Sequence, residues 1–206
     1  MRGFPRPDST FLDIPPLLAD GLAFSETIRA LADRYRSAGL AAIAGVEARG
    51  FFFAPAVAAE LGVGFLPIRK PEQLPGPTHR SSVVQMDYGE RQLELHSGLL
   101  PRSSHPGTAG HRVAVIDDVL ATGGSLLACV EVLRQLGVAV VEAACVYDLH
   151  LGGKAALEEV GVPAFCLANF REDGNREWWL ERGTEEEAAA TVSPHMGKRL
   201  KQAIKP

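Results

Sequence analysis

Two adjacent carboxylates, Asp117 and Asp118, follow the apolar run 113–116, and the small-residue turn 121–125 comes shortly after them. The apolar run predicts a buried strand, and open α/β sheets bind their ligands at the carboxyl ends of such strands. The turn contains two glycines and two hydroxyls and leads into a helical pattern, so its backbone N–H groups would lie at the positive end of a helix dipole. The segment therefore predicts a phosphate site, with the carboxylates beside it for sugar hydroxyls or a hydrated divalent cation.

A plain strand, turn and helix with an aspartate at the cap is the alternative interpretation of this segment. The paired aspartates, together with Thr122-Gly123-Gly124-Ser125, favour the phosphate site. The lysine of the Gly-x-x-x-x-Gly-Lys-Ser/Thr loop is missing, which excludes that type of nucleotide-hydrolase cradle.

The elements that must position this site alternate between helix and strand. A first helix is expected at 25–38, with Ser25 as its N-cap and Gly39 as its end. Beyond it, the expected elements are strand 40–46, helix 51–61, strand 63–68, strand 112–116, helix 125–136, strand 138–147, helix 153–160 and strand 164–168. Helices that alternate with strands are typical of an α/β fold with a mostly parallel sheet.

Residues 69–82 interrupt that order with three prolines, three basic residues and a histidine. This composition predicts an exposed loop, too long for a simple connection, that suits a mobile lid over a reaction site. An ordinary exposed loop with solvated charges is the alternative. Val83–Met86 and Gln92–His96 are expected to form a hairpin around 87–90, and 98–111 a second loop.

The composition is that of a globular domain with an appendage: 206 residues, 46% hydrophobic and 22% charged, with a net charge of −4. The acidic balance argues against a nucleic-acid partner, and no apolar run is long enough to predict a membrane span. Three widely spaced cysteines, Cys129, Cys145 and Cys166, fit neither a disulfide scaffold nor a zinc knuckle. With no apolar run near Met1 to indicate a secretory signal, we expect a cytoplasmic protein with reduced thiols and no membrane partner.

Residues 113–125 resemble the phosphoribosyl-diphosphate signature of the type I phosphoribosyltransferases. Three further stretches resemble the adenine-specific members of that family: 47–51 (Glu-Ala-Arg-Gly-Phe), 69–78 (Arg-Lys, then Leu-Pro-Gly-Pro-Thr) and 88–95 (Tyr-Gly, then Leu-Glu-Leu). A weaker match joins Phe4-Pro5 to Phe11-Leu12-Asp13-Ile14. The resemblance implies the α/β fold of that family: a central, mostly parallel sheet flanked by helices, with a small hood and a flexible loop.

The resemblance also implies a division of the chain. Residues 1–170 would form the phosphoribosyltransferase domain, and 171–206 would be a C-terminal extension outside the family pattern. Because Trp178 and Trp179 both lie in the extension, we expect it to be docked, with short helices at 185–190 and 198–204.

The reaction implied is transfer of the phosphoribosyl group from phosphoribosyl diphosphate to adenine, which gives AMP and pyrophosphate, with Mg²⁺ bound mainly through the donor. By the same analogy, the ribose hydroxyls face Asp117 and Asp118. The 5-phosphate would be held by Ala121, Thr122, Gly123, Gly124 and Ser125. The pyrophosphate would be held by Arg49, Arg69, Lys70 and Gln73.

On the base side, the resemblance implies that Phe11 and Val119 enclose the purine while the main chain at Thr10 and Leu12 reads its edge. The catalytic residues implied are Asp87, Arg49, Asp117 and Asp118. The lid residues implied are Pro75, Gly76 and Tyr88. In the family the lid serves a neighbouring subunit's site, so a homodimer is implied.

Several residues depart from the family pattern. Gln73 stands where the family usually has lysine, Asp87 where glutamate is common, and Leu12 where many members have arginine, while 101–109 are inserted. These departures leave two alternatives open: a transferase for another purine or a modified sugar diphosphate, and a non-catalytic ligand-sensing regulator. A DNA-reading regulator is disfavoured, because the residues before the first core helix are too few for a helix-turn-helix.

Overall fold

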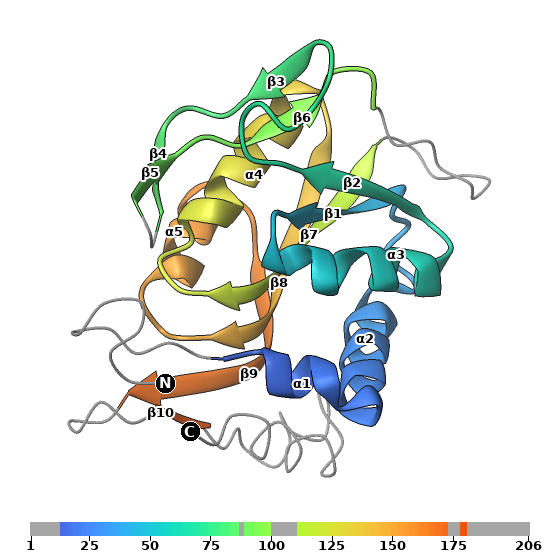
Figure 1. Ribbon diagram of the computed structural model, residues 1–206, viewed down its shortest axis with the longest axis vertical. Coiled ribbons are helices and arrows are strands. Elements are labelled where there is room, and N and C mark those ends of the chain that lie inside the picture. The colour runs from blue at the N-terminus through green and yellow to red at the C-terminus, as the bar shows by residue number, and fades with distance from the viewer. Residues whose placement is uncertain (1–12, 87–88, 100–110, 173–177, 181–206) are drawn as a thin grey trace.

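The computed structural model describes residues 13–86, 89–99, 111–172 and 178–180 (Figure 1). Its helices and strands, in chain order, are α1 (Pro15–Ala19), α2 (Gly21–Tyr35), β1 (Ala42–Val46), the 3₁₀ helix η1 (Arg49–Phe52), α3 (Ala54–Leu61), β2 (Gly64–Ile68), β3 (Thr78–Arg80), β4 (Val84–Met86), β5 (Gly89–Arg91), β6 (Glu94–His96), β7 (Arg112–Leu120), α4 (Gly124–Gln135), β8 (Ala139–Asp148), α5 (Gly153–Glu159), β9 (Ala164–Glu172) and β10 (Trp178–Leu180).

Five strands form a parallel sheet in the order β9-β8-β7-β1-β2, and β10 joins β9 in antiparallel orientation. Helices α2 and α3 lie against one face of this sheet, and α4 and α5 against the other (Figure 1). The predicted parallel α/β sheet flanked by helices is therefore confirmed. Because β7 lies between β1 and β8, its carboxyl end is enclosed by the ends of both neighbours.

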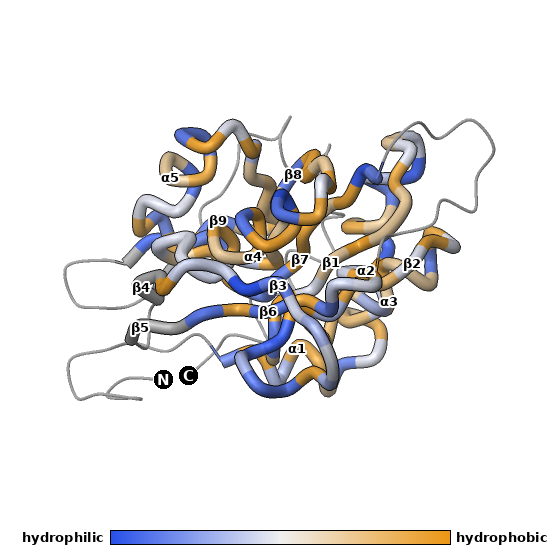
Figure 2. Tube along the Cα trace, turned by 90° about the horizontal axis from the view of Figure 1, so that it is seen from above, coloured by the Kyte–Doolittle hydropathy of each residue, from blue (hydrophilic) through white to orange (hydrophobic). Residues whose placement is uncertain are grey.

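The hydrophobic core has two layers, one on each face of the sheet. The layer beneath α2 and α3 includes Leu31, Phe53 and Tyr147, and the layer beneath α4 and α5 includes Leu126 and Leu157. Figure 2 shows hydrophobic residues concentrated in the middle of the molecule, around β1, β7 and β8. Packing on both faces holds the central strands rigidly, which is the condition for presenting a precise site at their ends.

Strand β7 is longer than the sequence predicted. It continues through both aspartates to Leu120 instead of ending at Ile116, because Val119 and Leu120 pair with Tyr147 and Asp148 of β8. The prediction that this strand ends at Ile116 is therefore wrong. The carboxylates belong to the strand itself, and sheet hydrogen bonding fixes their backbone.

The first long helix begins earlier than predicted, and Ser25 is not its cap. Asp20 accepts hydrogen bonds from the N–H groups of Leu22 and Ala23, at 3.0 and 3.1 Å, so α2 starts at Gly21. The helix expected at 51–61 is divided into η1 and α3. Pro55 lies in the first turn of α3, where its missing N–H is tolerated.

The predicted hairpin has the wrong partners. Strand β4 pairs with β5, whereas β6 pairs with β3, which lies inside the segment predicted as a loop. Leu93 and Leu95 are buried in the core, which draws their strand away from β4 and against the sheet side of the molecule. The remainder of 69–82, from Arg69 to Pro77, lacks strand or helix apart from a single bridge, as predicted.

The chain beyond residue 170 is described only in part. Strand β9 runs to Glu172, and Trp178–Leu180 forms β10 beside it, so this part of the extension adds a strand to the sheet. The helices expected at 185–190 and 198–204 lie outside the described residues. No described helix has the length and apolar character needed to cross a bilayer.

Candidate active site

Asp117 and Asp118 lie at the carboxyl end of β7 and are both buried, with 8% and 0% of their surface exposed. The N–H of Asp118 donates to Asp117 Oδ1 at 2.9 Å. Burial and the neighbouring charge of Asp118 raise the pKa of Asp117 well above its usual value. Burial also raises the pKa of Asp118, although nearby Arg49 opposes this rise. Two buried acids side by side are a costly arrangement that is typical of a functional site.

Arg49 reaches this pair from the loop after β1. Its Nε atom lies 2.9 Å from Asp118 Oδ2. The loop can approach because the next residue is Gly50: a Cβ there would lie 2.7 Å from the Ile116 carbonyl oxygen and 3.2 Å from Asp117 Oδ1. Only glycine fits so close a contact without displacement of β7. The structure thus brings together Arg49, Asp117 and Asp118, three of the residues predicted for the site.

The phosphate turn joins β7 to α4, and α5 supports it. Gly123 has a φ of +87°, which favours glycine, and α4 begins at the next residue. The N–H of Gly153 donates to the Ala121 carbonyl oxygen at 3.0 Å, and a Cβ on Gly153 would meet that oxygen at 2.6 Å. Within the turn, Thr122 is exposed and Ser125 half-buried. The predicted phosphate residues therefore form one turn at a helix N-terminus, beside the two aspartates.

Glu47 ties the Arg49 loop to the start of the lid segment, residues 69–82. Its Oε2 atom accepts hydrogen bonds from Arg69 Nε and from the N–H of Lys70, both at 2.9 Å. Burial works against ionisation of Glu47, but these two donors outweigh it and lower its pKa. The basic residues predicted to bind pyrophosphate thus come from two loops that one carboxylate joins.

Glu94 holds the rest of the lid segment. Its side chain is 1% exposed and accepts hydrogen bonds from four groups of that segment. These donors are the N–H of Gln73 (2.9 Å), the N–H of Leu74 (3.1 Å), Thr78 Oγ1 (3.3 Å) and Arg80 Nε (3.2 Å). Burial opposes ionisation, yet the backbone donors and Arg80 lower the pKa of Glu94.

Neither Glu47 nor Glu94 was among the residues predicted for the site. A sequence signal existed for Glu94, since an acid between Leu93 and Leu95 in a short strand is hard to bury without a dedicated set of donors. The predicted pyrophosphate residue Gln73 and the predicted lid residues Pro75 and Gly76 are exposed. Asp87 and Tyr88 lie outside the described residues.

Of the residues predicted to bind the base, the structure describes only Val119. Val119 is half-buried and packs against the core layer beneath α2 and α3. Thr10, Phe11 and Leu12 lie outside the described residues, and their roles stay predictions.

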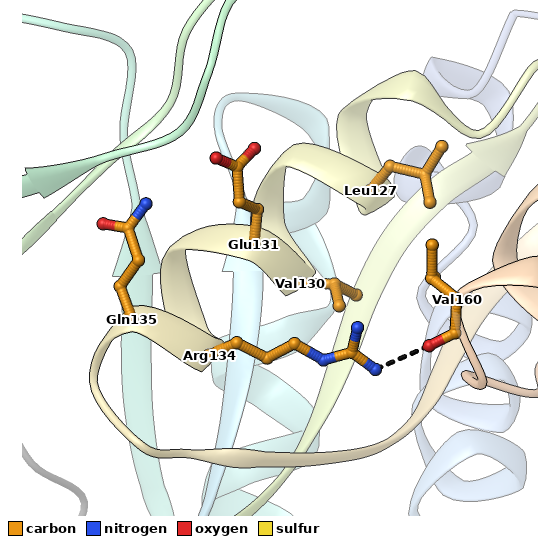
Figure 3. A pocket seen from close by; sticks show the side chains of 6 residues that line it. All are labelled: Leu127, Val130, Glu131, Arg134, Gln135 and Val160. Atoms are coloured by element: carbon orange, nitrogen blue, oxygen red, sulfur yellow. Dashed lines mark hydrogen bonds between the residues drawn. The ribbon is translucent and has the colours of Figure 1, made fainter.

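A surface pocket of about 650 Å³ lies elsewhere, on the outer side of α4 (Figure 3). It is lined by Leu127, Val130, Glu131, Arg134, Gln135 and Val160. Arg134 crosses it to donate to the Val160 carbonyl oxygen at 2.7 Å. None of these residues is among those predicted for the reaction, and the chemical groups gather instead at the ends of β7, β1 and β2.

Comparison with known proteins identifies the family. The phosphoribosyl transferase domain family matches residues 17–162. An adenine phosphoribosyltransferase of Pectobacterium atrosepticum is 44% identical over 168 residues, which are 81% of this chain and 86% of that protein. The adenine phosphoribosyltransferase structure from Thermoanaerobacter pseudethanolicus superposes with a TM-score of 0.73 at 35% identity, over 82% of this chain and 94% of that one.

The Saccharomyces cerevisiae adenine phosphoribosyltransferase, solved with an imino-altritol bisphosphate and adenine, gives a TM-score of 0.69 at 32% identity over 81% of this chain and 91% of that one. These likenesses confirm the type I phosphoribosyltransferase fold predicted from the sequence. They extend over most of both chains and include the predicted phosphate turn and both aspartates. The chain belongs to the adenine phosphoribosyltransferase family.

Proposed function

We infer that this protein transfers the phosphoribosyl group from phosphoribosyl diphosphate to adenine, with AMP and pyrophosphate as products, in purine salvage. Family membership supports this reaction, and the Saccharomyces cerevisiae relative was solved with adenine. In this chain, the main support for the proposal is that Arg49 contacts the buried Asp117–Asp118 pair beside the phosphate turn.

The proposed chemistry breaks the bond between C1 of the ribose and the pyrophosphate oxygen and forms a bond between C1 and a ring nitrogen of adenine. Positive charge develops on the sugar and negative charge on the leaving group, so catalysis consists mainly of positioning and charge stabilisation. Backbone N–H groups of 121–125 would bind the 5-phosphate. Arg49, Arg69 and Lys70 would stabilise the negative charge of the departing pyrophosphate.

Asp117 and Asp118 would accept hydrogen bonds from the ribose hydroxyls. Asp118 Oδ2 is paired with Arg49, whereas its Oδ1 is fully buried and has no hydrogen-bond partner among the described residues. Buried acceptors without donors are expected where a ligand supplies them. The same carboxylates would stabilise the positive charge that develops on the sugar.

Mg²⁺ fits this site as a companion of the donor. Oxygen ligands suit the ion, and two carboxylates lie at the expected ribose position. The described residues contain no group of three or more acidic, histidine or cysteine side chains that could hold a metal. We propose that the ion binds mainly through diphosphate and ribose oxygens. When bound, it would neutralise charge on the leaving group.

The remaining parts of the proposal come from the family resemblance. Asp87 and Tyr88 would close over the base with Pro75 and Gly76, while Gln73 would approach the pyrophosphate. Phe11 and Val119 would enclose the purine, and the main chain at Thr10 and Leu12 would read its edge. A homodimer would place the lid segment of one subunit over the site of its partner. The free, buried cysteines agree with a reducing, cytoplasmic location.

The test is pyrophosphate release with Mg²⁺ and phosphoribosyl diphosphate, measured separately with adenine, guanine, hypoxanthine and xanthine. We expect turnover of about 1–10³ s⁻¹ with adenine, the ordinary range for metabolic enzymes. Fast turnover with another base alone would move the assignment to that purine. Donor binding without turnover of any base would favour a modified substrate or a ligand sensor.

A further inference from the structure

The phenol of Tyr147 is a buried polar group with no hydrogen bond to the described part of the chain. Tyr147 lies near the carboxyl end of β8 and is 0% exposed, and its hydroxyl has no partner among the described residues. Its ring packs edge-on against Phe170, with centroids 5.3 Å apart, which fixes the direction of the hydroxyl. Nearly all buried hydroxyls in proteins have a hydrogen-bond partner. A buried hydroxyl without one therefore needs an explanation, and a bound ligand that accepts its hydrogen bond would provide it.

Tyr147 lies beside the proposed reaction centre. It is the register partner of Val119, which follows Asp118 directly and precedes the phosphate turn by two residues. Burial, and then the negative charge of Asp118, raises the pKa of Tyr147. The phenol therefore keeps its proton at neutral pH and is able to donate it in a hydrogen bond.

The topology places Tyr147 on the side opposite the leaving group. Arg49 follows β1, and Arg69 and Lys70 follow β2, so all the proposed pyrophosphate ligands lie on one side of β7. Tyr147 is on β8, which flanks β7 on the other side. In a direct displacement at C1, the incoming nitrogen bonds to one side of that carbon while the oxygen leaves from the other. The base is therefore expected on the β8 side.

The N-terminal segment reaches the same region. Ile14 and Leu17 are buried in the core layer that also contains Tyr147 and against which Val119 packs. The residues expected to read the base, 10–12, directly precede this anchored segment in sequence. Of the described residues on the base side, Val119 therefore packs against the layer that holds the Tyr147 hydroxyl.

We propose that Tyr147 is a specificity-determining residue of the base site, whose O–H donates a hydrogen bond to a ring nitrogen of the bound purine. This inference rests on the proposed phosphoribosyl transfer and adds to it a residue that reads the base. It predicts that the hydroxyl contributes to base binding but not to donor binding.

The test is Tyr147→Phe, which removes the hydroxyl and keeps the ring against Phe170. Adenine binding by equilibrium dialysis should weaken about 2- to 10-fold, the usual effect of one neutral hydrogen bond. The KM for phosphoribosyl diphosphate should not change, and the melting temperature should stay equal or rise, because an unsatisfied buried group is removed. Among 1-, 3- and 7-deazaadenine, the analogue without the contacted nitrogen should bind both proteins equally.

Tyr35→Phe is the matched control. The Tyr35 hydroxyl donates to Glu142 Oε2 at 2.7 Å, so this variant should lower the melting temperature and leave adenine binding unchanged. Equal adenine binding by the wild type and Tyr147→Phe would overturn the inference, and so would an equal loss for all three analogues. Because dialysis needs no turnover, this result is separate from the proposed function, which fails if the wild type binds adenine and releases no pyrophosphate.

Discussion

Arg49 Nε lies 2.9 Å from Asp118 Oδ2, so the guanidinium proposed for pyrophosphate and a carboxylate proposed for the ribose are paired with each other. The two partners differ in their access to water: 33% of the Arg49 side chain is exposed, against 1% for that of Asp118. Removing the arginine therefore has a different consequence for stability from removing the carboxylate. The arginine can be solvated without its partner, whereas the carboxylate would remain buried without a compensating charge.

This asymmetry predicts that Arg49→Ala destabilises the fold more than Asp118→Asn does. We expect a loss of about 1–3 kcal/mol for Arg49→Ala, reduced from the fully buried case because the arginine is partly exposed. Asp118→Asn should cost less, because it removes the buried charge and leaves an arginine that water can reach. Urea unfolding at neutral pH measures both, and equal losses would contradict the argument. Both variants should lose most of their turnover.

Asp117→Asn should stabilise the protein at alkaline pH while it abolishes activity. The folded-state pKa of Asp117 is raised, so its contribution to stability is fully present below the unfolded pKa of about 3.9 and is lost as pH rises through the folded value. Asparagine does not ionise, so the variant does not lose stability in this way as the pH rises. Its stability advantage over the wild type should grow as the pH increases and vanish in acid. The comparison of urea midpoints across pH tests this, and a constant difference between the two proteins at all pH values would contradict it.

Gly50→Ala should displace the Arg49 loop from β7. The new Cβ would lie 2.7 Å from the Ile116 carbonyl oxygen, a backbone atom that cannot move away easily. We expect a loss of about 1–3 kcal/mol in stability, together with a raised KM for phosphoribosyl diphosphate. Gly21→Ala is the matched control, because a Cβ added at Gly21 would have nothing within 4 Å. A normal donor KM in Gly50→Ala would show that the close approach is unimportant for the site.

The position of the two aspartates could be predicted from the sequence because the signal is local. An apolar run, two acids and a glycine turn are contiguous, and the chain geometry of a strand followed by a helix brings them together without further information. The extension of β7 through Val119 and Leu120 could not be predicted in the same way. It depends on pairing with β8, which lies about twenty-eight residues further along the chain.

The anchors of the lid segment were missed for the same reason. Glu94 gathers donors from Gln73 to Arg80, and this contact exists only because β6 pairs with β3 and not with β4. The burial of Leu93 and Leu95 determines which strand β6 pairs with, and local turn signals do not reveal that burial. The assignments at 10–12 and 87–88 rest on resemblance alone and stay predictions.

Glu94→Gln should loosen the lid segment and impair donor binding more than base binding. The amide keeps one acceptor oxygen but loses the charge that serves Arg80 and two backbone N–H groups. We expect the KM for phosphoribosyl diphosphate to rise severalfold, the KM for adenine to change little, and stability to fall by about 1–3 kcal/mol. Faster limited proteolysis within 69–80 would report the loosened segment directly.

The pH dependence of this variant has the opposite sign to that of Asp117→Asn. The folded-state pKa of Glu94 is lowered, so its contribution is present above the unfolded pKa of about 4.3 and is lost as pH falls through the folded value. The stability deficit of Glu94→Gln should therefore shrink in acid. Glu60→Gln is the control, since Glu60 on α3 accepts a hydrogen bond from Arg36 and has no bond to the described lid segment. A similar donor KM in the two variants would contradict a role for Glu94 in the lid.

Gln73→Lys should tighten donor binding if the lid segment approaches the pyrophosphate. The Gln73 backbone is held by Glu94 while its side chain is exposed, so the substitution adds a charge without breaking the anchor. A partly exposed contact of this kind is expected to contribute about 1 kcal/mol, or roughly a fivefold lower KM for phosphoribosyl diphosphate, and the gain should shrink as salt is added. Ser37→Lys adds the same charge at an exposed position after α2 and should leave the KM unchanged. If both variants bind the donor like the wild type, residue 73 does not face the leaving group, and the pyrophosphate is held by Arg49, Arg69 and Lys70 without it.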